Sequence, residues 1–175
     1  MLTALMSTAL LCSGCPRVLY LDYHPSTPIK GKGPVRVAAF EYSGHPTGLM
    51  KQKELESGSR NTERLYLSQN IGEFFTGALT KELVFAGYDL KPDAERVVWG
   101  TIEQFFLDYV RADEQHFQIR ATFSVSRNDT PTFTTSCRSD RQQVKDWMKS
   151  GLLIEQGIRD CIEEFMRNAQ AAAAL

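Results

Sequence analysis

Side chains that commonly do chemistry are few and scattered in this sequence of 175 residues. The three histidines, His24, His45 and His116, lack the short His-His or Cys-His spacing of a metal site. Neither a Gly-x-Ser-x-Gly elbow nor a glycine-rich phosphate loop leading into a helix is present. Acidic pairs such as Glu163-Glu164 fit a solvated helix face better than an acid/base dyad. We therefore expect no catalytic residue, no metal site and no cofactor, in a protein that is not an enzyme.

Two of the four cysteines follow an almost unbroken run of apolar and small residues from Leu2 to Leu11. A run of about ten residues is too short to span a bilayer as a helix, but it matches the hydrophobic region of a signal peptide. The residues Cys12-Ser13-Gly14-Cys15 look like a bacterial lipobox, in which small residues precede the cysteine that becomes the mature N-terminus. This resemblance implies a signal peptide over residues 1–14 and a lipidated, palmitate-carrying Cys15.

Two features depart from the lipobox pattern. Cys12 stands where leucine is preferred, and the chain begins Met1-Leu2-Thr3 without the lysine or arginine of a signal peptide. The alternative is a buried N-terminal helix or strand that ends in two core cysteines. We expect the lipidated form, because a multiply acylated Cys15 would hold the protein stably in a membrane.

The other two cysteines point into the predicted core. Cys137 falls on the inward face of a predicted strand, and Cys161 falls on the apolar stripe of the last predicted helix. In an oxidising periplasm they could form a disulfide that closes a loop of about 25 residues and contributes about 3 kcal/mol. The alternative is two buried thiols that pack as small hydrophobic groups. The sequence leaves both open.

Hydrophobic periodicity predicts the elements that position these residues. Alternating apolar residues predict strands over 35–40, 96–109 and 116–126, and Phe133, Thr135 and Cys137 mark a further strand. Apolar residues three and four positions apart predict helices over 68–85 and 144–169. Ser68 is the expected N-cap of the first helix, and Gly87 follows its C-terminus. The order β-α-β-β-β-α predicts an α+β two-layer sandwich, with an antiparallel sheet of about four strands and two helices on one face.

The segment between the lipidated cysteine and the folded domain has the composition of a tether. Residues 15–34 are rich in proline and glycine, and they would reach roughly 60 Å when extended or 20–25 Å as a flexible coil. Residues 18–21 could instead form a short edge strand. The α+β domain is expected over 35–169, followed by a tail over 170–175.

Several features together resemble the YajG-like family of bacterial lipoproteins. They are the lipobox, the strand Val35–Phe40, the helix ending Phe85-Ala86-Gly87-Tyr88, the hairpin at Phe117-Gln118-Ile119-Arg120 and the C-terminal amphipathic helix. The resemblance covers most of the chain. It implies an envelope protein of largely unassigned function, and no catalytic residue is carried over from it.

The formal net charge of −1 argues against a nucleic-acid binder. We expect a non-enzymatic binding or assembly module, anchored to the membrane by its lipid and contacting an envelope protein. Pro16 is not the aspartate that favours inner-membrane retention, so we expect an outer-membrane lipoprotein facing the periplasm. The oligomeric state stays undetermined. The candidate contacts are Arg60, Asn61 and Arg64 in a polar loop and Phe105, Phe106 and Tyr109 on a strand.

Each group of candidate contacts has a plainer interpretation. The polar cluster also fits a solvated approach to the first helix, and the aromatic residues also fit a core position on one side of the sheet. The second functional hypothesis is a carrier of a small molecule or lipid, with its ligand between the sheet and the helices. An envelope enzyme is a third, and it would require a pocket that gathers acidic residues of perturbed pKa.

Overall fold

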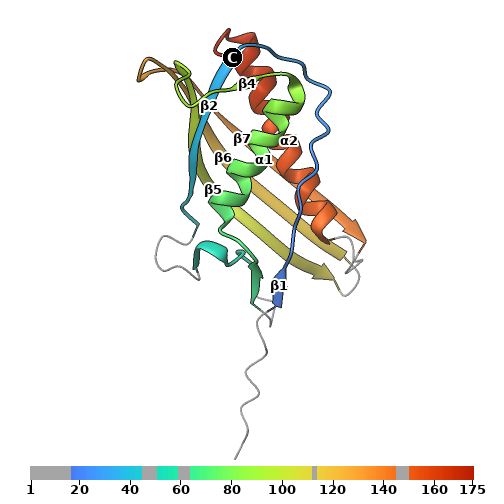
Figure 1. The fold of residues 1–175 in the computed structure, drawn as a ribbon. Helices are drawn as coiled ribbons and strands as arrows, with labels where there is room; N and C mark the ends of the chain where they lie inside the picture. Colours follow the sequence, from blue (N-terminus) through green and yellow to red (C-terminus); the bar gives the residue numbers. More distant parts are fainter. Residues whose placement is uncertain (1–16, 45–50, 59–63, 112–113, 145–149) are drawn as a thin grey trace, which may run out of the picture.

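In the computed structural model of this chain, two helices cover one face of a five-stranded sheet (Figure 1). The structure describes residues 17–44, 51–58, 64–111, 114–144 and 150–175, without the side chains of residues 109–111 and 144. None of the helices it describes is long and apolar enough to cross a membrane. The strands are β1 Arg17–Leu19, β2 Pro34–Tyr42, β3 Leu65–Leu67, β4 Asp89–Leu90, β5 Arg96–Arg111, β6 Glu114–Arg127 and β7 Thr130–Val144, and the helices are η1 Lys51–Lys53, α1 Ile71–Ala86 and α2 Ser150–Ala171.

The α+β sandwich predicted from the sequence is confirmed, with two corrections to its sheet. The strand order is β4-β2-β5-β6-β7, so the sheet has five strands rather than about four, and β1 and β3 form a separate pair. The sheet is also mixed, because β2 runs parallel to both β4 and β5 while β5, β6 and β7 are antiparallel. A parallel pair needs a crossover connection, and α1 supplies it between β2 and β5.

The helix boundaries differ slightly from the predicted ones. Asn70, not Ser68, caps α1, because its side chain accepts a hydrogen bond from the Gly72 amide at 2.9 Å. Gly87 ends the helix as expected, in the left-handed conformation at φ 103°. The second helix begins at Ser150 and not near Val144, because Val144 is still part of strand β7.

Packed aromatic rings fill the space between the sheet and the helices. The Phe123 and Phe165 rings stack at 4.4 Å between centroids, and Phe75 lies 5.1 Å from Phe40. Phe75, Phe123 and Phe165 are fully buried. Each buried ring of this size removes a large apolar area from water, which stabilises the sandwich.

The segment predicted to be a tether is part of the folded domain. From β1 it runs along α1 and α2 to the start of β2, as the blue chain in Figure 1 shows. Leu19 and Leu21 pack against the core, and Tyr23 is 3% exposed. The alternative prediction of a short strand at residues 18–21 agrees better with the structure than a free tether does, since β1 covers Arg17–Leu19 and pairs with β3. We call residues 17–33 the strap.

A buried carboxylate fixes the strap to the helices. Glu82 of α1 is 0% exposed and accepts hydrogen bonds from the Tyr23 hydroxyl at 2.7 Å and the Thr27 amide at 3.0 Å. Its first oxygen also accepts from the Ser26 amide at 3.2 Å and lies 3.5 Å from Nε of Arg159 on α2. A buried carboxylate is tolerated when its oxygens are hydrogen-bonded and its charge is paired, and Glu82 meets both conditions.

Removing the charge of Glu82 should loosen the strap. In Glu82→Gln the side-chain NH2 group replaces one carboxylate oxygen, so the strap donors that now point at that oxygen lose their acceptor. We therefore expect the free energy of unfolding to fall by roughly 2–4 kcal/mol. Urea denaturation measures this change, and proteolysis should cleave the strap faster. The control Glu73→Gln, on the exposed side of α1, should cost less than about 1 kcal/mol. Equal losses in the two variants would show that Glu82 does not hold the strap.

Candidate functional site

The structure places only some of the residues that the sequence singled out. Cys15, Arg60 and Asn61 lie outside the described residues. Arg64 is exposed just before β3, and its Nε lies 3.9 Å from a carboxylate oxygen of Glu54. Tyr109 belongs to β5 and pairs with Gln115 of β6, but its side chain is outside the description. The two predicted contact groups are therefore only partly placed.

The neighbouring residues Phe105 and Phe106 lie on opposite faces of the sheet. Phe105 is fully buried beside Phe117, with ring centroids 5.1 Å apart, so it is a core residue and not an exposed contact. Phe106 is half-buried on the outer face, where its ring meets that of His116. The β5–β6 register shifts between Ile102 and Gln104, and this irregularity decides which ring turns inward.

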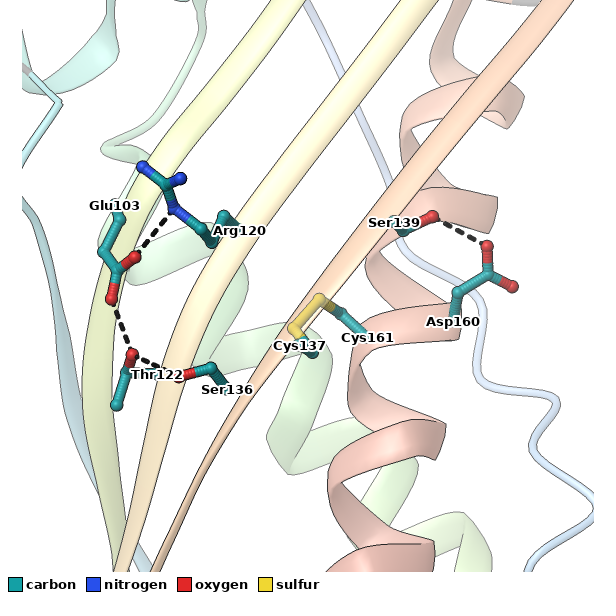
Figure 2. The surroundings of a disulfide bond; sticks show 8 residues. All are labelled: Glu103, Arg120, Thr122, Ser136, Cys137, Ser139, Asp160 and Cys161. Carbon is teal, nitrogen blue, oxygen red and sulfur yellow. Dashed lines mark hydrogen bonds and ion pairs between the residues drawn. A yellow bond between two sulfur atoms is a disulfide. The ribbon is translucent and has the colours of Figure 1, made fainter.

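Cys137 and Cys161 form a disulfide that joins β7 to α2 (Figure 2). Their Cα atoms are 5.2 Å apart, and the two residues are 24 positions apart in the sequence. Both are buried, at 3% and 0% exposure, so the bond lies within the core. Of the two arrangements that the sequence leaves open, the structure has the bonded one.

A polar clamp beside the disulfide holds the same two elements together. Arg141 of β7 donates two hydrogen bonds, each 2.6 Å long, to the carboxylate of Asp160 on α2. The Ser139 hydroxyl donates to the same carboxylate at 2.8 Å (Figure 2). The hydrogen bond with Asp160 raises the pKa of Arg141 above its usual value. Strand β7 is therefore attached to the helix layer by one covalent and one ionic link.

The outer face of the sheet carries a connected polar network. The Glu103 carboxylate on β5 lies 2.8 Å from Nε of Arg120 and accepts a hydrogen bond of 2.6 Å from the Thr122 hydroxyl, both on β6. Thr122 in turn contacts the Ser136 hydroxyl on β7 at 3.0 Å, so the network crosses three strands (Figure 2). The alternation of residues 116–126 indicated this wet face, but not which strand supplies each partner.

A second group on the outer face joins β6 to β7 nearer the β5–β6 hairpin. His116 contacts the Asp140 carboxylate, which also accepts a hydrogen bond from the Gln118 amide at 3.0 Å. Partial burial pulls the pKa of Asp140 upward, but these hydrogen bonds and the nearby charge of Arg138 hold it below its usual value. Among the described residues, no group of three His, Cys, Asp or Glu side chains could hold a metal ion.

The long strand β7 forms one edge of the sheet. It is 15 residues long, and in the described part of the chain only β6 pairs with it. Its outward side chains are polar, and Thr134, Ser136 and Arg138 are exposed. An edge of this kind presents backbone donors and acceptors to which another extended chain can add as a strand.

Sequence reasoning missed Glu82, which has long-range polar contacts with Tyr23, Ser26, Thr27 and Arg159. A signal for it was present, because Glu82 follows Ala78 and Leu79 by three or four positions and therefore lies on the apolar stripe of α1. A carboxylate at such a position must find donors, and they come from the strap, 55 to 59 residues away.

Comparisons with known proteins establish the fold alone. Neither a family model nor a curated protein sequence matches the chain. A Xanthomonas campestris protein assigned to the DUF330 family model is similar in structure, with a TM-score of 0.68 and 8% identity, over 89% of this chain and 96% of the other. A hypothetical protein of Chlamydia trachomatis has a TM-score of 0.54 and 11% identity, over 82% and 98% of the two chains. The YajG-like resemblance stays a prediction.

A weaker similarity is to a minor lipoprotein from Acinetobacter baumannii. Its TM-score is 0.45 with 13% identity, over 80% of this chain and 92% of the other. This score is too low to carry an argument about the present chain.

Breaking the disulfide should lower stability without unfolding the domain. For a loop of this length, Cys137→Ala with Cys161→Ala should reduce the free energy of unfolding by about 3 kcal/mol, chiefly because the unfolded chain gains freedom. Guanidinium denaturation with and without dithiothreitol measures this effect. The reductant should destabilise the wild-type protein and leave the double variant unchanged. A wild-type protein indifferent to the reductant would contradict the prediction.

Proposed function

We propose that this chain is a lipid-anchored binding or assembly module of the bacterial cell envelope and not an enzyme. In this proposal Cys15 carries the lipid, and the domain faces the periplasm from the outer membrane. The lipobox residues support the anchor, and the YajG-like resemblance agrees with it. An envelope protein is the partner.

One observation carries the binding role: in the described part of the chain, residues 130–142 of β7 pair with β6 alone, so the outer side of this strand forms an edge of the sheet. An extended segment of a partner can add to this edge through backbone hydrogen bonds, and side chains on the outer face can then select the segment. The disulfide and the Arg141–Asp160 clamp attach β7 to helix α2. A strand that is already fixed loses little conformational freedom when a partner pairs with it.

The alternative of a carrier with its ligand between the sheet and the helices has less support. That interface is filled by rings such as Phe75, Phe123 and Phe165, each 0% exposed. A ligand could enter only by displacing packed side chains, at a cost in dispersion and burial energy.

The anchor predicts a specific mass for the N-terminal peptide. When the protein is expressed in a bacterium and recovered from membranes, the peptide should begin at Cys15 and carry acyl chains. A Cys15→Ser variant should lose this mass and appear in the soluble fraction. A wild-type protein that keeps residues 1–14 without acylation would overturn the anchor.

The β7 edge predicts where a partner is captured. A photo-crosslinking residue at Ser136 should form one defined adduct in the envelope, whereas the same residue at the exposed Asn168 of α2 should form none. Thr134→Lys should reduce the adduct several-fold, because a lysine on an edge strand opposes the addition of another strand. The matched Ala172→Lys variant, which changes an exposed residue just after α2, should leave the adduct unchanged. Equal adducts at both crosslinker positions would contradict the edge as the binding site.

A further inference from the structure

We propose that the domain lies directly on the bilayer, with the end formed by β1, β3 and η1 against anionic phospholipid headgroups. This inference rests on the proposed anchor at Cys15 and adds an orientation to it. We call this end, defined by Arg17, Val18, Tyr20, Lys51, Lys53 and Arg64, the basal end. The opposite end carries β4, the start of β2 and the turn between β6 and β7 (Figure 1).

The chain between the lipid and the fold is very short. Only Pro16 stands between Cys15 and Arg17, the first residue of β1. Two residues span at most about 7 Å, even when fully extended. A domain whose first strand starts within that distance of the acylated residue cannot stand tens of ångströms from the membrane, as a free tether would allow.

Arg17 is also held in place, so the short connection fixes an orientation. Its amide donates to the Arg64 carbonyl at 3.1 Å, and the Ser68 amide donates to the Leu19 carbonyl at 3.0 Å. Beyond β1 the strap is bound through Glu82 to both helices. The lipidated residue is therefore connected to a part of the domain that is fixed by hydrogen bonds. The end of the domain that carries Arg17 must then face the bilayer.

The charges at the basal end suit an anionic surface. Lys51 lies 3.1 Å from Glu54, and the Arg64 side chain is 3.9 Å from the same carboxylate. The two basic side chains are 46% and 73% exposed, whereas that of Glu54 is only 12% exposed. Lys53 and Arg17 add two further positive charges at this end; both residues are half-buried, and the Lys53 ammonium donates a hydrogen bond of 3.2 Å to the Ser68 carbonyl. Glu54 is thus turned inward, whereas Lys51 and Arg64 are exposed to solvent, where headgroup phosphates can meet them.

Exposed apolar side chains follow directly after the anchor. Within the strap, Leu19 and Leu21 turn toward the core, while Val18 is 42% exposed and Tyr20 is 84% exposed. Tyrosine is enriched at the level of the headgroups, because its ring is apolar and its hydroxyl is polar. Val18 and Tyr20 follow the proposed acylated residue Cys15 by three and five positions. Their side chains can therefore enter the headgroup region of the membrane when the acyl chains insert.

The orientation can be measured on the acylated full-length protein in vesicles that contain phosphatidylglycerol. A fluorophore on Lys53→Cys should be quenched strongly by lipids with spin-labelled headgroups. The same fluorophore on Lys91→Cys, near β4 at the opposite end, should be quenched at least three-fold less. Helix α1, with 16 residues, separates the two ends by about 24 Å. Equal quenching, or stronger quenching at position 91, would overturn the orientation.

The lipid contact can be tested apart from the anchor with the Cys15→Ser protein and the same vesicles. Lys51→Gln with Lys53→Gln should weaken vesicle binding by up to about 25-fold, because each lysine near an anionic surface contributes a factor of about five. The control Lys32→Gln with Lys91→Gln removes the same charge from the opposite end and should change little. Tyr20→Ser should also weaken binding, whereas Phe85→Ser, at the C-terminal end of α1, should not.

The outcomes separate this inference from the proposed function. Loss of acylation in the mass measurement would remove the anchor, and the orientation would fall with it. Normal acylation with equal quenching at both ends would leave the anchor intact and overturn the orientation alone. Equal weakening by the two lysine pairs would show that the basal end has no special affinity for lipid. A basal end that crosslinks to a protein rather than to lipid would assign it to a protein partner instead.

Discussion

The burial of Glu82 is the constraint on which the arrangement of this molecule depends. A carboxylate placed on the apolar stripe of α1 would be very costly without partners, and its partners come from the strap and from α2. Satisfying this one group brings the N-terminal segment, the first helix and the last helix together. A segment of tether-like composition is thereby converted into a fixed part of the domain.

The fixed strap changes how the anchor would act on the protein. A flexible tether leaves a lipoprotein domain free to adopt all orientations above the membrane. A strap that is bound to the domain from Arg17 onward would instead keep the domain in one orientation relative to the lipid. In the proposed arrangement the basal end would face the bilayer, and the other end would face the periplasm. The edge strand β7 begins at the end opposite the basal end, and it is the last strand of the five-stranded sheet (Figure 1).

Several features of the fold could be predicted because their causes are local. The alternation over residues 116–126 reports a strand with one wet face, and Gly87 ends α1 because a glycine accepts the left-handed conformation there. The inward position of Cys137 and Cys161 follows from the same periodicities. The parallel pairing of β2 with β5 could not be predicted in this way, because the period of a strand does not depend on the direction of its neighbour.

The sequence by itself determined the fold class, the faces of the main elements and the placement of two cysteines in the core, since periodicity and end signals act over a few residues. Only the tertiary structure decided that the strap is folded against the helices. The Thr27 amide of the strap donates to Glu82, 55 positions away in the sequence, and composition cannot report such a contact. The tertiary structure also decided which of Phe105 and Phe106 is buried. A shift of one residue in strand register exchanges the two faces, and only the pairing with β6 sets where that shift falls.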